Sequence, residues 1–196
     1  MVIRGADDAG QTLGLYIVAI AALFFLAFAF FAVGQASVDR NSVQSAADAA
    51  ALAAARESRD EAHDALLAAL TSGDTAKLGD LVQLLGKDTG EPCMKARAFA
   101  GDNGARAYNC VRNGGPGAYT VDVESLTTLG RTVVHGTENV RAEAHASAEV
   151  TSRCDGLETE GSLLTFTCDG GKVTVDPTSA DFTLDLSAFY AVHLTS

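Results

Sequence analysis

The stretch Leu13–Ala36, LGLYIVAIAALFFLAFAFFAVGQA, decides the fold, because its 24 residues include no charged side chain and no proline. As a helix it is long enough to cross about 30 Å of hydrocarbon. The chain then continues without an evident break into Ser45–Ala55, SAADAAALAAA, a composition that strongly favours helix. The small side chains of this second stretch also let neighbouring backbones approach closely. We therefore expect one helix that begins in a membrane and leaves it.

The 196 residues leave room for one membrane segment and one modest domain. We expect four parts: a cytoplasmic leader over 1–12, a transmembrane helix over 13–36, an extramembrane continuation or stalk over 37–72, and an extracytoplasmic head over 73–196. Gly73 is the first convincing helix stop, since no proline precedes Pro92.

A cleaved signal peptide is the alternative interpretation of the N-terminal region. Signal peptides carry a basic leader and an apolar core of about 7–15 residues. Here the leader holds one arginine and two aspartates, and the apolar run is longer. Retention as a single-pass anchor is the better interpretation.

The charge balance argues against two classes of partner. Lys and Arg total 14, against 25 Asp and Glu. Such an acidic surface disfavours phosphate backbones and anionic lipid headgroups as the main partner. We expect no nucleic acid and no small-molecule substrate.

The four cysteines, Cys93, Cys110, Cys154 and Cys168, all follow the apolar run. Their spacing includes no Cys-x-x-Cys and no histidine at zinc-ligand distance, which favours disulfides over a metal site. Three connectivities exist, and we favour Cys93–Cys110 with Cys154–Cys168 because each closes a short local unit. Four free buried thiols are the alternative. Disulfides would place the head outside the cytoplasm and the N-terminus inside.

The stalk has an apolar stripe that must be covered. A polar stripe recurs at helical spacing through Asn41, Gln44, Asp48, Arg56, Arg59 and His63. Roughly opposite lie the candidate helix-packing residues, Val43, Ala46, Ala47, Ala50, Ala53 and Ala54. Because an isolated helix gains little stability from propensity alone, either the chain's own head or neighbouring copies must cover this stripe.

The head is expected to be α+β, with an antiparallel sheet and two short helices. The helices are predicted over 75–85 and from Glu91 to Gly104. Period-two patterns predict strands over 105–111, 119–124, 139–151, 163–168, 172–176 and 182–194. The clearest strand is Val140–Val150, in which Val or Ala occupies every even position.

No catalytic or nucleotide-binding motif occurs in the sequence, so we expect no enzyme and no cofactor. The histidines, His63, His135, His145 and His193, are scattered. His145 and His193 could meet across the sheet and bind a metal, but both lie on predicted polar faces, where solvated histidines are commoner.

Two segments together resemble the N-terminal region of TadE/TadG-like proteins of Flp (tight-adherence) pilus assembly. They are Gly10-Gln11-Thr12-Leu13, which opens the apolar helix, and Asn41–Ala55, NSVQSAADAAALAAA, which follows it. Ala98–Ala105, AFAGDNGA, leading to Cys110, resembles the region after the stalk in such proteins.

The resemblance implies a pilin-like protein of the bacterial cell envelope, a minor pilin or assembly component of the cell membrane or a surface filament. Its partners would be the membrane, other pilin-like subunits or assembly proteins, and copies of itself. The family's prepilin cleavage site corresponds to Gly10 and Gln11, and its tyrosine to Tyr16, whereas Leu15 stands where the family's pilins have glutamate. A membrane-tethered binding or sensing domain that never polymerises is the alternative function, and a hydrolase without a recognisable motif is a third.

Overall fold

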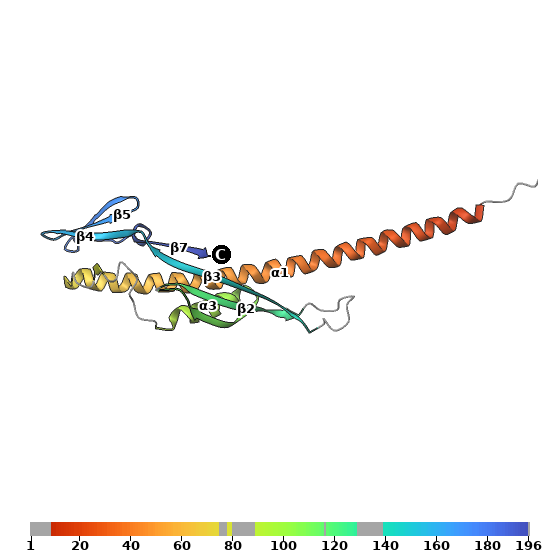
Figure 1. Cartoon of the computed structure of the whole chain (residues 1–196), viewed down its shortest axis with the longest axis horizontal. Helices are drawn as coiled ribbons and strands as arrows, with labels where there is room; N and C mark the ends of the chain where they lie inside the picture. The colour runs from red at the N-terminus through yellow and green to blue at the C-terminus, as the bar shows by residue number, and fades with distance from the viewer. Residues whose placement is uncertain (1–8, 75–77, 80–88, 116, 129–138, 196) are drawn as a thin grey trace, which may run out of the picture.

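Figure 1 shows a long helix with a mixed head lying along its C-terminal half. This computed structural model describes residues 9–74, 78–79, 89–115, 117–128 and 139–195. The helix, α1, spans Ala9–Ser72 without interruption, so the expected continuation from the apolar run into the alanine-rich stretch is confirmed. The predicted helix over 75–85 lies outside the described residues except for Leu78 and Gly79, which are helical.

The end of α1 is set by Gly73. Its φ of 70° is a left-handed conformation that glycine adopts without a Cβ penalty. The Gly73 N–H donates to the Leu70 carbonyl at 3.4 Å, and the Asp74 N–H donates to the Ala69 carbonyl at 3.2 Å. These two bonds form a Schellman motif and satisfy carbonyls that the helix leaves open.

The larger sheet has the strand order β1-β2-β3-β7, with all neighbours antiparallel. Its strands are β1 (Ala105–Arg112), β2 (Tyr119–Thr128), β3 (Arg141–Ser152) and β7 (Tyr190–Thr195). The helix α3 (Glu91–Asp102) packs beside β1, and α1 packs against β3 and α3. We call the elements from α3 to β7 the head. The α+β fold class is confirmed.

A smaller sheet extends the head past the middle of α1. Its strands are β4 (Cys154–Glu160), β5 (Leu163–Cys168) and β6 (Gly171–Val175). Only Arg153 separates β3 from β4, and its backbone bonds to Phe189 and Asp169 join the two sheets. Figure 1 shows this sheet near the C-terminal end of α1, away from the apolar segment.

Two features of this region differ from the sequence-based prediction. The strand predicted over 182–194 is wrong in its first part, because Asp185 caps a short helix, α4 (Leu186–Phe189), ahead of β7. The Asp185 carboxylate accepts bonds from the Ser187 N–H at 2.9 Å and from the Ser187 hydroxyl at 2.7 Å. These bonds lower the pKa of Asp185. Strand β4 was not predicted at all.

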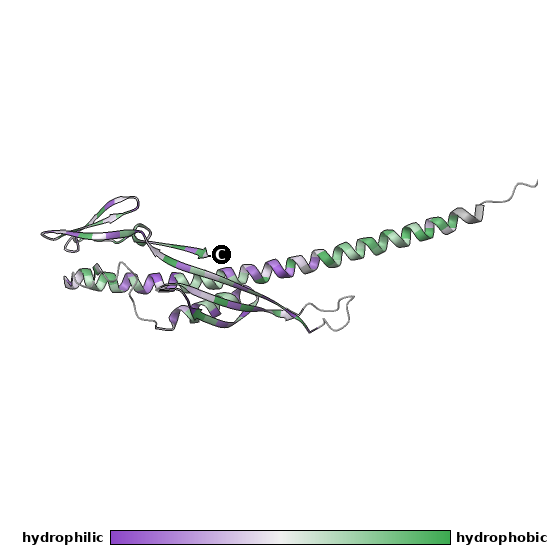
Figure 2. Ribbon diagram, viewed as in Figure 1, coloured by the Kyte–Doolittle hydropathy of each residue, from purple (hydrophilic) through white to green (hydrophobic). Residues whose placement is uncertain are grey.

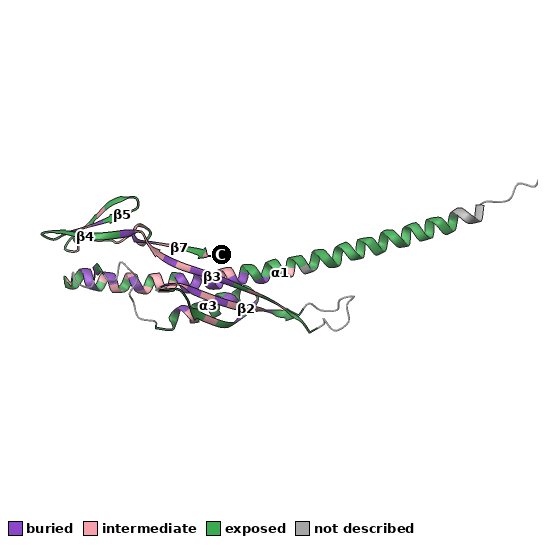
Figure 3. Ribbon diagram, in the orientation of Figure 1, coloured by how far each residue is buried: buried purple, intermediate pink, exposed green. Residues whose placement is uncertain are grey.

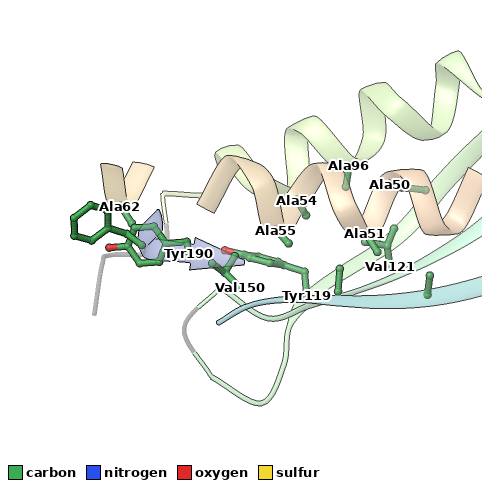
Figure 4. Close-up of a cluster of buried hydrophobic side chains, with 14 of the residues drawn as sticks. Ala50, Ala51, Ala54, Ala55, Ala62, Ala96, Tyr119, Val121, Val150 and Tyr190 are labelled. Carbon is green, nitrogen blue, oxygen red and sulfur yellow. The ribbon is translucent and has the colours of Figure 1, made fainter. Parts of the chain in front are cut away.

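The core of the far end of the head is aromatic. Phe166 and Phe189 meet edge to face, with ring centroids 5.1 Å apart. Tyr190 lies beside Ala62 of α1 in Figure 4. Burial raises the pKa of Tyr190 to about 12. The end of α1 is thus held by packing rather than left free in solvent.

Candidate assembly interface on the long helix

The N-terminal part of α1 is apolar and bare. From Leu13 to Gln35 every residue is exposed, and Phe30 is 75% exposed. Figures 2 and 3 show this segment as hydrophobic and exposed together. Within the described residues, α1 is long and apolar enough to cross a membrane, and its most apolar window is not covered by the rest of the chain. A surface of this kind requires lipid or another protein around it.

The bare segment is uneven in shape. Phe24, Phe28 and Phe31 surround Ala27 and form a shallow apolar hollow of about 320 Å³. Because the side chain of Ala27 is only a methyl group, a depression remains between the three phenylalanine rings. Bulky side chains beside small ones allow a second helix to interlock with this surface.

The alanine-rich part of α1 is covered by the chain's own head. All six candidate packing residues are buried: Val43, Ala46, Ala47, Ala50, Ala53 and Ala54. The structure therefore shows that the chain's own head, rather than a neighbouring copy, covers the apolar stripe. A neighbouring copy could reach these residues only by displacing the head.

The buried arc of α1 is wider than the predicted stripe. It also includes Ala51, Ala55, Ala62, Leu66, Ala69 and Leu70. The reason is that α1 lies between two elements, with β3 on one side and α3 on another. Figure 4 shows Ala54 and Ala55 close to Val150 and Tyr119 of the sheet, and Ala96 of α3 beside the same helix.

Ala27 and Phe31 of the hollow lie on the side of α1 away from the head, whereas Phe28, 18 residues before the buried Ala46, lies on a side that the head covers further along the helix. At 100° per residue, Ala29 and Ala47 fall on the same side of the helix, because 18 residues make about five turns. Ala27 and Phe31 then lie about 160° from Ala47, on the opposite side. A partner helix that docks against Ala27 and Phe31 would therefore lie on the side of α1 opposite the head.

A groove lies where α1 leaves the head. Its volume is about 740 Å³, and its walls are Gln44, Asp48, His145, Ala146, Ser147, Leu194 and Thr195. Gln44 Nε2 donates to Asp48 Oδ1 at 2.9 Å and to the His145 carbonyl at 3.2 Å. The second bond links the stalk to β3 across 101 residues of sequence. Sequence reasoning assigned Gln44 only to a solvated stripe.

The cysteines form the pairs Cys93–Cys110 and Cys154–Cys168, the connectivity favoured from the sequence. The first pair joins α3 to β1, with Cα atoms 5.7 Å apart. The second joins the start of β4 to the end of β5, where the two residues are direct partners across the strands. Because the chain has only these four, no thiol is free.

The open face of the larger sheet is polar. Glu149 Oε1 lies 3.0 Å from His193 Nε2, its cross-strand partner. Asn109 Nδ2 donates to Asp122 at 2.7 Å. His145 lies opposite Asp122 and is not paired with His193. Among the residues that the structure describes, no three His, Cys, Asp or Glu side chains are placed to hold a metal ion.

Residues 10–57 match the Tad family model, described as "Putative Flp pilus-assembly TadE/G-like". The match covers the bare segment and the first turns that the head covers, and it leaves out the head itself. No curated protein and no solved structure matches the chain.

The Tad match begins at Gly10, the residue expected to precede a processing site. Gly10 and Gln11 lie in the first turn of α1, which begins at Ala9. The match ends at Glu57, beyond the last of the six candidate packing residues, Ala54. The family model therefore spans the helix from the expected cleavage position through the hollow and the six candidate packing residues.

Proposed function

We propose that this chain is a non-enzymatic, pilin-like component of a Flp-type pilus-assembly system, acting as a minor pilin or assembly protein. The observation that carries the proposal is the division of α1: its apolar part is bare, its alanine-rich part is occupied by the head, and the Tad match spans both. A helix built in this way can associate with other subunits through the bare part while the head stays folded.

The topology belongs to the same proposal. Residues 1–12 would lie in the cytoplasm, 13–36 would cross the membrane, 37–72 would form the stalk, and the head would lie outside the cell. The disulfides support this orientation, because such bonds persist in oxidising compartments.

The assembly contact would form in the hollow around Ala27. In lipid, helices associate by close van der Waals packing rather than by the hydrophobic effect. The partner would be a membrane helix of another subunit, which replaces lipid around Phe24, Phe28 and Phe31. Hydrophobic burial would then pass from lipid to protein with little net loss. The alanine stripe would serve folding instead, so deleting residues 46–55 would disrupt the head rather than test assembly.

The experiment fills the hollow with a larger apolar side chain, which introduces no polar group into the segment. Ala27→Phe should keep membrane insertion and reduce co-isolation with Flp pilus-assembly proteins from native membranes about tenfold, because a lost close contact of about 1.4 kcal/mol has that effect. Ala29→Phe, on the other side of the helix, is the matched control and should retain the partners.

Three outcomes are informative. Equal retention by Ala27→Phe and Ala29→Phe would remove the hollow from the mechanism. If the unmodified protein co-isolates with no pilus-assembly protein after cross-linking, the pilus role is wrong and the tethered binding or sensing domain replaces it. Loss confined to Ala27→Phe supports the proposal.

Processing is a separate part of the proposal. Cleavage between Gly10 and Gln11 would remove the leader and start the mature chain within the first turn of α1. An intact mass of the membrane-extracted protein should lack Met1 to Gly10. A full-length mass would show that the chain keeps its leader and acts as an unprocessed component.

A further inference from the structure

The head reaches back toward the membrane along α1. In Figure 1 the end of the β2–β3 pair that carries Thr128 and Arg141 points toward the apolar part of the helix. The hydrogen bond from Gln44 to the His145 carbonyl shows that His145 of β3 lies beside Gln44 of α1. From His145 to Arg141 the strand covers about 13 Å, which equals about nine residues of helix. Because β3 crosses α1 obliquely in Figure 1, this is the upper limit of its reach along the helix, and Arg141 lies level with a residue between 35 and 44, near the end of the apolar segment.

This end of the head exposes apolar side chains. Leu126 of β2 is 51% exposed, and Val140, just before β3, is 45% exposed. Val38 of α1, at nearly the same level, is 66% exposed. In water such a group is unfavourable, whereas in the interfacial layer of a bilayer each side chain gains from burial.

Arg141 at this end is paired within the chain, whereas Arg40 of α1 and Asn139 are exposed. Arg141 Nη1 donates to the Ser125 carbonyl at 2.7 Å and to the Leu126 carbonyl at 2.6 Å. The nearest acidic pair in the strands, Glu124 and Glu143, lies further from the membrane than Arg141. Among the described residues at this end, Arg40 and Arg141 are accompanied by the acidic Asp39, so no basic cluster forms, which fits zwitterionic rather than anionic lipid.

We propose that Leu126 and Val140 form a second membrane contact, in which the end of the head rests in the headgroup layer of the leaflet that α1 leaves. The contact rests on the proposed insertion of residues 13–36. Together with α1 it gives the chain two points of attachment, which limit rotation and tilt of the head relative to the bilayer.

The test uses single labelled cysteines, which the absence of free thiols makes selective. Leu126→Cys and Val140→Cys in the full chain are coupled to an environment-sensitive NBD dye and reconstituted into phosphatidylcholine nanodiscs. Leu163→Cys is the matched control, because Leu163 is an apolar residue, 41% exposed, on β5 at the other end of the head. Phe28→Cys reports insertion of the apolar segment.

Lipids that carry a spin label near the headgroup should quench the dye at 126 and 140 about twofold or more relative to the dye at 163, because the interfacial layer extends about 5–10 Å. Quenching at 28 without quenching at 126 and 140 would overturn the second contact and leave the anchor intact. The dye at 28 is read with lipids that carry the spin label in the acyl chain, because Phe28 lies about 12 Å inside the proposed span, and no quenching there would overturn the anchor as well. A blue shift at 126 and 140 without lipid quenching would show a protein partner there and would also overturn the proposal.

Discussion

At the scale of single residues, the alanines of α1 determine how closely the head can approach the helix. Ala50 and Ala54 have no exposed surface and face the sheet and α3. A larger side chain at such a position must move backbone, because protein cores are packed at crystal-like density.

Ala50→Leu should therefore lower the free energy of unfolding by about 1–3 kcal/mol, the usual cost of overpacking a core. Ala68→Leu is the matched control, since Ala68 lies on the exposed side of the same helix. Urea unfolding of both variants in detergent micelles, followed by circular dichroism, measures the difference. Equal stability of the two variants would show that the helix–head contact is loose.

Tyr190 predicts an alkaline limit on stability. Burial raises its pKa to about 12, from the ordinary value of 10. The folded state therefore keeps the phenol proton where the unfolded state has lost it. Stability is unaffected below pH 10 and falls between pH 10 and 12 by at most about 1.4 kcal/mol per pH unit.

Unfolding measured at pH 9, 10 and 11 should show this decline, and Tyr190→Phe should reduce its slope, because the variant removes the titrating group. If the free energy of unfolding of Tyr190→Phe falls with pH as steeply as that of the unmodified chain, other groups cause the loss of stability at alkaline pH.

Single positions also show what sequence could and could not predict. The six packing residues follow helical spacing, so their common side was readable from the sequence. Ala51 and Ala55 were not assigned, because the sheet covers α1 beyond the predicted stripe, and Figure 4 shows them near Val121 and Val150. The Gln44 contact with His145 depends on tertiary placement, and no local pattern encodes it.

At the scale of elements, the disulfides hold different parts of the head. Cys93–Cys110 ties α3 to β1, and both elements contact α1. Replacing both residues by alanine should cost about 3 kcal/mol, since the bond closes a loop of 17 residues. The whole helix–sheet contact should weaken.

Cys154→Ala with Cys168→Ala is the comparison, because it removes a loop of similar length, 14 residues, at the edge of the smaller sheet. Hydrogen exchange should show faster exchange in β4 and β5 with little change in β2 and β3. Loss of protection across the larger sheet in that variant would mean that the two sheets unfold as one unit.

The missed strand β4 has a physical explanation. A register shift lies between Asp155 and Leu157, and Gly156 has a φ of 70°. This irregularity breaks the alternation of apolar and polar residues that identifies a strand. By contrast, β3 alternates strictly and was predicted almost to its ends. The β4–β5 ladder is held in register by the disulfide and the pairing of neighbours, which a single-strand pattern does not report.

At the scale of the whole molecule, folding and the proposed membrane insertion use separate parts of α1. The buried residues of the helix begin at Val43, and the segment before it contributes no buried side chain among those described. A chain of residues 37–196 should therefore fold without detergent and remain monomeric, as measured by light scattering and thermal unfolding.

A chain of residues 56–196 is the control for this truncation. It lacks Val43 to Ala55, so the sheet and α3 lose the helix surface that covers them, and it should aggregate or remain unfolded. If 37–196 aggregates in the same way, the apolar segment contributes to the fold of the head. The sequence predicted both parts of the helix, but only the structure shows that the second part belongs to the head.

Because α1 is uninterrupted, a change in the tilt of its N-terminal part moves its C-terminal end and the head with it. Beyond residue 36 the helix extends for about 54 Å, and the head is attached along that length rather than through a hinge. At the roughly 20° inclination that membrane helices adopt on average, its far end swings sideways by about 18 Å. A modest reorientation of the proposed membrane segment would thus become a large displacement of the outermost sheet.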